Sequence, residues 1–279
     1  SLKHERDLLE GSMKASINSF KSIYKNLKEG KRQIRDEVEV AIEPIIQLIE
    51  KNYDLAKKLW EIEVTDAYTF DHSVRVCLMS ALIGKWMNLS KERIHDVAIA
   101  GLLHDTGKCR VPDEILNKPG RLTPDEFQLM KGHPEAGLKI LSEVPGISPL
   151  VLKGVYEHHE RIDGTGYPRG LTDTRISMVA KIIAIADVYS AMTTDRVYRI
   201  KSSPFEAAEA MMDELFTGLD PLLSRKFLSR LSQFYVGSHV MLSDGRVARV
   251  VMNNKYAPSK PLVLVEDDFI DLAKSDQLA

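Results

Sequence analysis

Histidines and aspartates are the residues of this sequence best suited to chemistry. His104 and Asp105 are adjacent, and they follow an apolar run at residues 98–103. An unpaired carboxylate at the rim of a hydrophobic core is costly, and a divalent cation is a common partner that stabilises it. The pair alone is weak evidence, because chance often places a histidine beside an aspartate.

Further metal-ligand residue types recur along the chain. Each of the eight histidines, taken singly, would more often be a surface or core residue than a ligand. The candidates together are five histidines and two aspartates: His72, His104, Asp105, His133, His158, His159 and Asp187. These donors suit Fe, Mn, Co, Ni or Zn in open, hydrolytic coordination. Seven ligands exceed what one ion needs, so they would suit two ions about 3.5–4 Å apart that share a carboxylate. Two-metal sites of this kind catalyse nucleophilic attack on phosphorus.

Three other features suit an anionic ligand. Lys108 is either a solvated surface lysine or a charge that stabilises phosphoryl oxygens. Residues 164–168 read Gly-Thr-Gly-Tyr-Pro, a tight loop in which Gly166 lets the backbone approach a ligand and Tyr167 offers a flat face and a hydroxyl. Arg196 and Arg199 would share one side of a helix, and they either pair with surface carboxylates or bind phosphate.

The elements that must position these residues are helices. From residue 65 to 234 the periodicity is helical, with turn or capping residues at 88–90, 118–120, 145–146 and 203–204. We expect one all-helical domain of about seven helices there, with an irregular loop from 161 to 175. Adjacent residues of a regular helix diverge by about 100°, so His158 and His159 predict a helix end or distortion.

The flanking segments have different patterns. Residues 1–64 predict an amphipathic helical segment in which Ile42, Ile45 and Ile49 share a face and Pro44 lies near the helix start. That face would pack on the neighbouring domain or, alternatively, form a homodimer or transmit a signal. Residues 235–279 predict a small β-rich extension with strands at 238–242, 246–251 and 262–265. Three short strands are unstable alone, so they should pack against the helical body.

Composition excludes several classes of protein. The 38 basic and 40 acidic residues give a net charge of -2, so no global positive field attracts polymeric nucleic acid or anionic lipid. Cys77 and Cys109 fit neither a disulfide framework nor a thiolate cluster, which makes a reducing cytoplasm the expected location. No apolar run reaches the roughly 18 residues of a membrane span. The chain begins with Ser, which leaves open an upstream sensory domain.

Two longer stretches resemble the signatures of the HD-GYP family of metal-dependent phosphodiesterases. The first is His-Asp-Thr-Gly-Lys at 104–108, followed by Val-Pro-Asp-Glu-Ile-Leu at 111–116 and Lys-Pro-Gly at 118–120. The second is His-His-Glu-Arg-Ile-Asp-Gly-Thr-Gly-Tyr-Pro at 158–168. The likeness extends from about residue 68 to 234. It implies a mainly α HD-type domain whose substrate is cyclic di-GMP.

The resemblance also implies a role for each candidate ligand. One ion would be held by His72, His104, Asp105 and Asp187, and the second by His133, His158 and His159 with Asp105 bridging. Some family members bind a third metal through an acidic residue one turn before the first histidine. That position is Tyr68 here, and Asp66 and Asp71 face elsewhere at helical spacing. We therefore expect two divalent transition metal ions. Iron or manganese is preferred, and zinc, nickel or cobalt is the alternative.

For catalysis and substrate binding, the resemblance implies Asp105 and Lys108 at the scissile phosphate, and for the rest of the ligand it implies Gly166, Tyr167, Arg196 and Arg199. A metal-bridging hydroxide would open one phosphodiester to give linear pGpG, and a second round would give GMP. The intact ligand set disfavours a sensor that binds the nucleotide without cleaving it. The Gly-Tyr-Pro signature disfavours a nucleotidase acting on mononucleotides, and a metal-free signalling scaffold is a third alternative.

Overall fold

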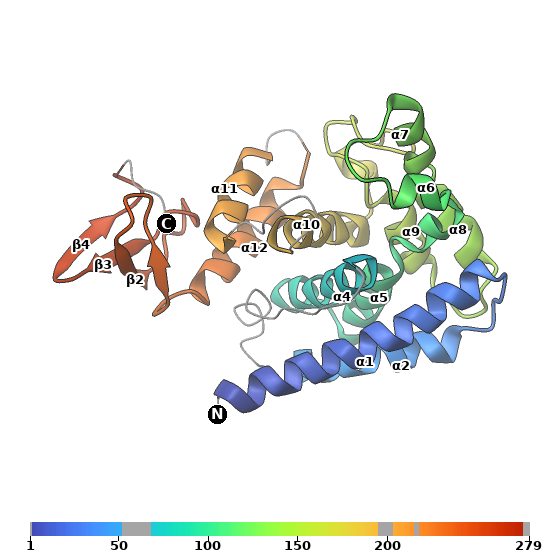
Figure 1. Cartoon of the computed structure of the whole chain (residues 1–279), viewed down its shortest axis with the longest axis horizontal. Helices are drawn as coiled ribbons and strands as arrows, with labels where there is room; N and C mark the ends of the chain where they lie inside the picture. Colours follow the sequence, from blue (N-terminus) through green and yellow to red (C-terminus); the bar gives the residue numbers. More distant parts are fainter. Residues whose placement is uncertain (1, 52–67, 195–202, 215–217, 276–279) are drawn as a thin grey trace.

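The computed structural model describes residues 2–51, 68–194, 203–214 and 218–275. The described part is mainly helical, with a small sheet at one end (Figure 1), as predicted. Its helices are α1 (Leu2–Lys28), α2 (Arg35–Glu50), α4 (Tyr68–Trp86), α5 (Lys91–Leu103), α6 (Asp113–Leu116), α7 (Pro124–Lys131), α8 (His133–Ser142), α9 (Pro149–Glu157), α10 (Met178–Thr193), α11 (Pro204–Glu214) and α12 (Pro221–Gln233). Two short 3₁₀ helices are η1 (Thr106–Arg110) and η2 (Asp173–Arg175).

The first two helices form a hairpin along one side of the body (Figure 1). Gly30 lies in the connection with φ at +88°, a conformation that glycine adopts without strain. α1 buries side chains at spacings of three and four, namely Leu9, Met13, Ile17, Phe20, Ile23 and Leu27. Phe20 meets Phe70 of α4 edge to face at 6.0 Å between ring centroids. The hairpin therefore belongs to the same hydrophobic core as the central helices.

The predicted place of Pro44 near a helix start is wrong. α2 begins at Arg35, so Pro44 lies inside the helix. Proline cannot donate a hydrogen bond to the carbonyl four residues earlier, which here belongs to Val40. Val40 is 62% exposed, so water can take the missing donor's place.

Four helices, α4, α5, α9 and α10, make the centre of the body, and most of the candidate ligands lie within them or directly after their ends. α5, α9 and α10 each begin at a serine, Ser90, Ser148 and Ser177, whose side chain accepts a hydrogen bond from the third backbone N–H of the helix. A Cβ added at Gly154 of α9 would lie 2.7 Å from Val179 and 2.8 Å from Ile183 of α10. This glycine therefore permits the close packing of the two helices.

The C-terminal sheet is antiparallel, in the order β1 (His239–Met241), β2 (Val247–Met252), β3 (Leu262–Val265) and β4 (Asp268–Asp271). The sequence predicted the first three strands and missed β4. Its hairpin turns through Glu266 and Asp267 with φ of Glu266 at 53°, and this pair lacks the usual Asn-Gly or Asp-Gly signal. Ser259 bonds to Glu209 of α11, and Lys260 pairs with the same carboxylate at 3.4 Å. The sheet thus packs against the helical body, as expected.

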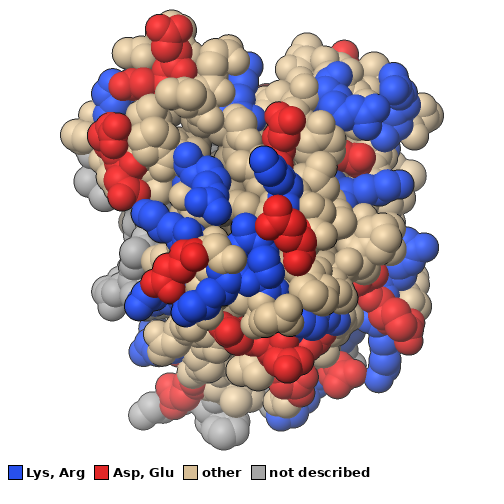
Figure 2. Space-filling model, turned by 90° about the vertical axis from the view of Figure 1, so that its right-hand side faces the viewer, with Lys and Arg blue, Asp and Glu red and all other residues tan. Residues whose placement is uncertain are grey.

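The described helices include none that is long and apolar enough to span a membrane. On the face shown in Figure 2, basic and acidic side chains are interspersed. This agrees with the net charge of -2.

Candidate metal centre

His104 and Asp105 lie where α5 ends and η1 begins. Residues 97–103 of α5 are buried, so the helix carries the pair into the interior. The chain then tightens, and the Lys108 amide donates to the Asp105 carbonyl at 3.0 Å. Both candidate side chains are at most 3% exposed. A charge in such a place requires a partner.

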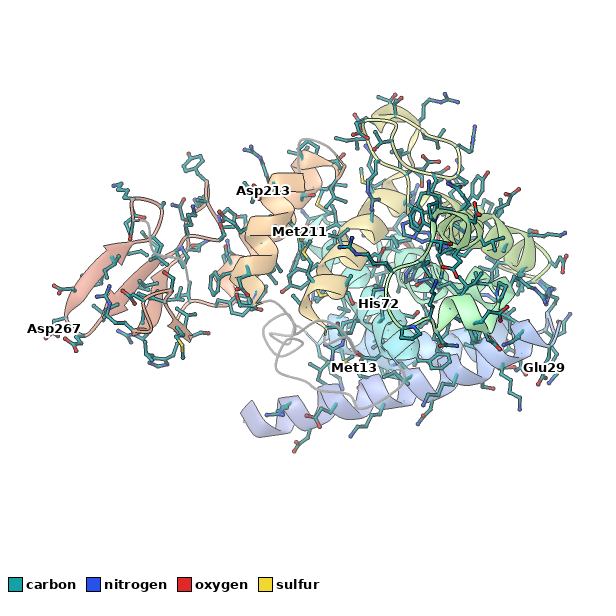
Figure 3. All side chains as sticks on the ribbon, turned by 45° about the horizontal axis from the view of Figure 1, so that its top comes forward. Met13, Glu29, His72, Met211, Asp213 and Asp267 are labelled. Carbon is teal, nitrogen blue, oxygen red and sulfur yellow. The ribbon has the colours of Figure 1, made fainter. Side chains whose placement is uncertain are left out.

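The other candidate ligands come from four helices. His72 is the fifth residue of α4, His133 is the first residue of α8, and Asp187 lies within α10. Figure 3 labels His72 in the interior of the helical body. α9 ends at Glu157, so His158 and His159 lie at the predicted helix end, with ring centroids 4.1 Å apart.

The structure brings all seven candidates together in two groups. Asp105, His133, His158 and His159 form one group, and His72, His104 and Asp187 form the other. Within each group the potential ligand atoms lie within 4.8 Å of one another. Asp105 joins the groups, because one of its oxygens lies 3.2 Å from His133 Nε2 and the other 3.3 Å from His104 Nε2. This is the division into two sets that the resemblance implied.

Backbone carbonyls determine which ring nitrogen of three histidines carries the proton. Nδ1 of His104, His133 and His158 lies 2.7 Å from the carbonyl oxygens of Gly101, Met130 and Val155, respectively. A carbonyl only accepts hydrogen bonds, so each Nδ1 donates and each Nε2 keeps its lone pair. Metal-binding histidines are commonly oriented in this way.

These lone pairs leave an electrostatic imbalance that a cation would remove. Nε2 of His133 and Nε2 of His158 are 3.3 Å apart, although neither has a proton to share in the neutral tautomer. His104 Nε2 and Asp105 Oδ1 are buried without a hydrogen bond within the described residues. Buried polar atoms are rarely left in this state. The donor set therefore fits divalent metal ions.

Most of the pKa shifts favour the metal-binding protonation states. Burial lowers the pKa of His159 to about 3, and burial with the neighbouring histidines holds the pKa of His158 well below its usual value. Burial opposes ionisation of Asp105, but His104 and Lys108 outweigh it and hold its pKa well below the usual range. His104 is the exception: burial lowers its pKa, but Asp105 outweighs burial and the net shift is upward. A metal ion there would compete with a proton.

Several residues that the sequence did not single out support the ligands. The Ser190 hydroxyl lies 3.0 Å from His72 Nδ1, while His72 Nε2 lies 3.0 Å from Asp187. Ser190 follows Asp187 by one helical turn on α10, which is a signal that helical periodicity offered. Gly107 lets η1 approach α8, since an added Cβ would lie 1.8 Å from the His133 carbonyl oxygen.

The irregular loop after His159 is held by a buried acid. Glu160 accepts hydrogen bonds from the amides of Arg169 and Leu171, both at 2.7 Å. Gly166 is packed on the loop's own backbone, because an added Cβ would lie 2.3 Å from the Arg161 nitrogen. The glycine therefore has a packing role that is independent of any ligand.

The loop places Tyr167 beside the ligands. Its ring stacks on His159, with centroids 4.7 Å apart and planes inclined by 23°. Burial raises the pKa of Tyr167, and the charges of Asp105 and Asp187 raise it further. Tyr167 thus lies within electrostatic reach of a carboxylate from each group.

Lys108 is the other candidate catalytic residue that the structure describes. Its ammonium lies 2.6 Å from an oxygen of Asp105, while 24% of the side chain is exposed. Lys108 therefore lies between the buried carboxylate and solvent.

Arg196 and Arg199 lie outside the described residues. Their role in binding the substrate therefore stays a prediction.

The third-metal position has no carboxylate in the described part of the chain. Tyr68 is the first residue of α4, and Asp66 lies outside the described residues. The buried Asp71 accepts a hydrogen bond from Arg75 at 2.8 Å, so its carboxylate serves an ion pair. The expected number of two ions stays a prediction.

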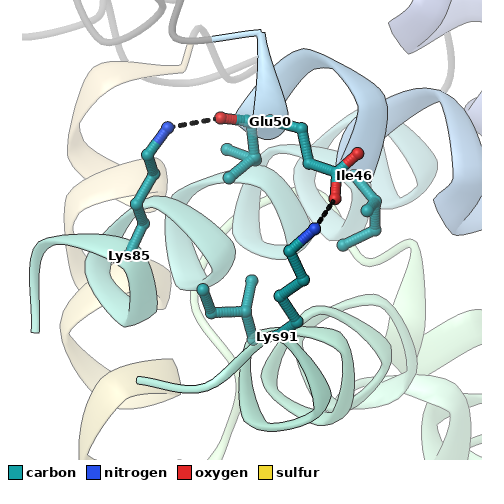
Figure 4. Close-up of a pocket in the computed structure, with 6 residues that line it drawn as sticks. Ile46, Glu50, Lys85 and Lys91 are labelled. Atoms are coloured by element: carbon teal, nitrogen blue, oxygen red, sulfur yellow. Dashed lines mark hydrogen bonds and ion pairs between the residues drawn. The ribbon is translucent and has the colours of Figure 1, made fainter. Parts of the chain in front are cut away.

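A pocket lies away from this centre. It has a volume of about 460 Å³ and lies between α2, α4 and α5 (Figure 4). Lys91 pairs with Glu50 there at 3.0 Å, and Lys85 donates to the Ile49 carbonyl. It gathers no set of metal ligands among the described residues. This pocket is therefore separate from the candidate metal centre.

Comparison with known proteins agrees with the geometry. The family model described as HD domain matches residues 45–223. The chain is similar to a cyclic di-GMP phosphodiesterase of Pseudomonas aeruginosa, with 40% identity over 209 residues that cover 74% of this chain and 50% of the relative. It is also similar to 3′3′-cGAMP-specific phosphodiesterase 1 of Vibrio cholerae, with 36% identity over 175 residues that cover 62% and 40% of the two chains.

Among solved structures, the fold resembles that of an HDG"Y"P protein from Bdellovibrio bacteriovorus. The TM-score is 0.64 at 19% identity, and the match covers 77% of this chain and 69% of that chain. At this identity the match supports the fold alone. The chain spans half or less of the length of the two curated relatives.

Proposed function

Since the chain belongs to the HD domain family, we propose that it is a metal-dependent phosphodiesterase. Its substrate would be a cyclic dinucleotide, with cyclic di-GMP as the first candidate. The observation that carries the proposal is the pair of ligand groups joined by Asp105, with three histidines whose neutral rings carry the proton on Nδ1 and the lone pair on Nε2. A pure receptor for the nucleotide has no need of such an arrangement.

Divalent ions bound by these residues would supply activated water and would polarise phosphoryl oxygens. The chain's own residues have separate tasks. The carbonyls of Gly101, Met130 and Val155 orient the histidines, and Asp105 holds the two groups together. Lys108, already paired with Asp105, would place its charge on the scissile phosphate.

Finer assignments belong to the same proposal. The ions would be iron or manganese, and the products would be pGpG and, after a second cleavage, GMP. Residues 65–234 would be the catalytic domain, while the helices within 1–64 would serve as a connector or a homodimer interface. Arg196 and Arg199 would bind the second phosphate and a guanine, the protein would act in the cytoplasm, and an upstream sensory domain would control it.

The test is turnover with defined metals. Metal-stripped protein given Mn(II) or Fe(II) should convert cyclic di-GMP to a linear product, resolved by chromatography. His159→Ala should abolish this turnover, whereas His239→Ala, a substitution at an exposed strand residue, should not change it. Binding of the nucleotide without cleavage in the metal-loaded protein would contradict the proposal and indicate a sensor.

A further inference from the structure

Helix α7 presents an aromatic ring and an ammonium group side by side next to the metal centre. Phe127 and Lys131 are four residues apart and lie on one side of the helix. Lys131 Nζ lies 5.1 Å from the centroid of the Phe127 ring and 5.4 Å from that of the Tyr167 ring. The ammonium thus lies between an outer ring and the ring that stacks on His159.

Packing of the hydrophobic core does not explain the placement of Phe127 and Lys131. α7 has no buried residue, and Phe127 is 45% exposed. The helix lies at the edge of the body (Figure 1). It is held by a capping box between Thr123 and Glu126 and by the pairing of Glu126 with Lys118 at 2.6 Å. The fold can therefore keep α7 in place without the Phe127 ring.

Lys131 has no carboxylate partner within the described residues, where its contacts are with the two rings. An ammonium beside a ring retains donors for a ligand, because a cation–π contact uses none of its N–H groups in a conventional hydrogen bond. The strip that runs from His159 through Tyr167 and Lys131 to Phe127 thus combines aromatic rings with one ammonium group that has donors to spare.

We propose that Phe127 and Lys131, beside Tyr167, form a subsite for a guanine base of the cyclic dinucleotide, an inference that rests on the proposed function. The Phe127 ring would stack on the base, since every base has a face that an aromatic side chain can cover. Lys131 would donate to O6 and N7 of guanine, both of which are acceptors. Adenine carries an amino group in place of O6, so the subsite favours guanine.

The experiment compares Phe127→Ala, Lys131→Met and Lys131→Arg with the control Leu129→Ala. Leu129 is 56% exposed on the same helix but points about 200° away from Phe127, so its removal tests general effects on α7. Each metal-loaded variant is assayed with cyclic di-GMP, with cyclic di-AMP and with bis(p-nitrophenyl) phosphate, which has no base. Titration calorimetry with cyclic di-GMP measures binding independently of turnover.

Phe127→Ala should lower kcat/KM for cyclic di-GMP roughly tenfold to a hundredfold, the range for loss of one base–aromatic stack. That loss should appear mainly in KM and exceed the loss with bis(p-nitrophenyl) phosphate at least several-fold. Lys131→Met should reduce the preference for cyclic di-GMP over cyclic di-AMP, and Lys131→Arg should retain it. Leu129→Ala should match the wild type with every substrate.

Two results would overturn the subsite: unchanged kinetics and affinity for cyclic di-GMP in both Phe127→Ala and Lys131→Met, or equal losses with all three substrates. If the wild type binds cyclic di-GMP without cleaving it, the proposed function fails. Calorimetry then still decides the subsite, because weaker binding by Phe127→Ala supports it and equal binding refutes it. A wild type that neither binds nor cleaves cyclic di-GMP refutes both.

Discussion

Gly107→Ala tests most strictly how the fold positions the metal centre. An added Cβ would lie 1.8 Å from the His133 carbonyl oxygen and 2.5 Å from the Gly137 nitrogen, and neither backbone atom can rotate away. Ordinary contact begins at 3.4 Å, so η1 and α8 must separate by about 1.5 Å to restore a normal van der Waals distance. Asp105 and Lys108 move with η1, whereas His133 moves with α8.

The expected cost has two parts. A misplacement of about 1 Å in a positioned site costs about 10²-fold in rate. Overpacking destabilises a protein by about 1–3 kcal/mol, and each kcal/mol lowers Tm by about 2–4 °C in a chain of this size. We expect Gly107→Ala to lose about 10²-fold in kcat and several degrees in Tm.

The assay is hydrolysis of bis(p-nitrophenyl) phosphate at saturating Mn(II), followed by thermal unfolding of the same samples. Gly11→Ala is the matched control, because Gly11 lies in α1 with no heavy atom within 4 Å of an added Cβ. It should keep the rate and gain up to about 1 kcal/mol in stability from better helix propensity. Wild-type kcat and Tm in Gly107→Ala would refute the argument that contact of η1 with α8 sets the site.

Three further substitutions separate the roles of single residues. Asp105→Ala should lose both metal ions and all turnover while the far-UV circular dichroism stays helical, because the residue joins the two ligand groups; one retained metal equivalent with normal activity would contradict the bridge. Lys108→Ala should keep its metal by elemental analysis and lose about 10²–10³-fold in rate, the scale of one preorganised donor; a metal-free variant would show a structural role instead. Glu160→Gln should lower the unfolding free energy by about 1–3 kcal/mol. The two loop N–H groups donate to different oxygens of Glu160, and the glutamine side chain has only one oxygen. An unchanged denaturation midpoint would mean that these bonds do not hold the loop.

Sequence reasoning predicted the parts of this molecule that depend on local pattern. His104 and Asp105 follow a continuous apolar run. Such a run predicts a buried helix, and the polar residues at its end mark a candidate site. The adjacent His158 and His159 predicted the end of α9 because two neighbours cannot share one face of a helix. The chemistry of the ligand types then limited the choice of metals.

Features that depend on tertiary contacts could not be predicted from the sequence. Pro44 suggested a helix start, yet α2 begins at Arg35 and continues through it. The supporting role of Glu160 depends on partners up to 11 residues away in an irregular loop, which periodicity does not reveal. The turn at Glu266 lacks a hairpin signal, so β4 went unpredicted. The sequence has no proline directly after Thr193, so it gives no strong signal that α10 ends there.

Metal titration coupled to turnover tests the central claim most directly. Protein stripped of metal under anaerobic conditions would be titrated with Fe(II) or Mn(II), while bound metal and cleavage of cyclic di-GMP are followed in the same samples. Two ligand groups joined by Asp105 predict two equivalents per chain, with turnover that rises only as the second equivalent binds. Full turnover without bound metal, or saturation of turnover at one equivalent, would contradict the account.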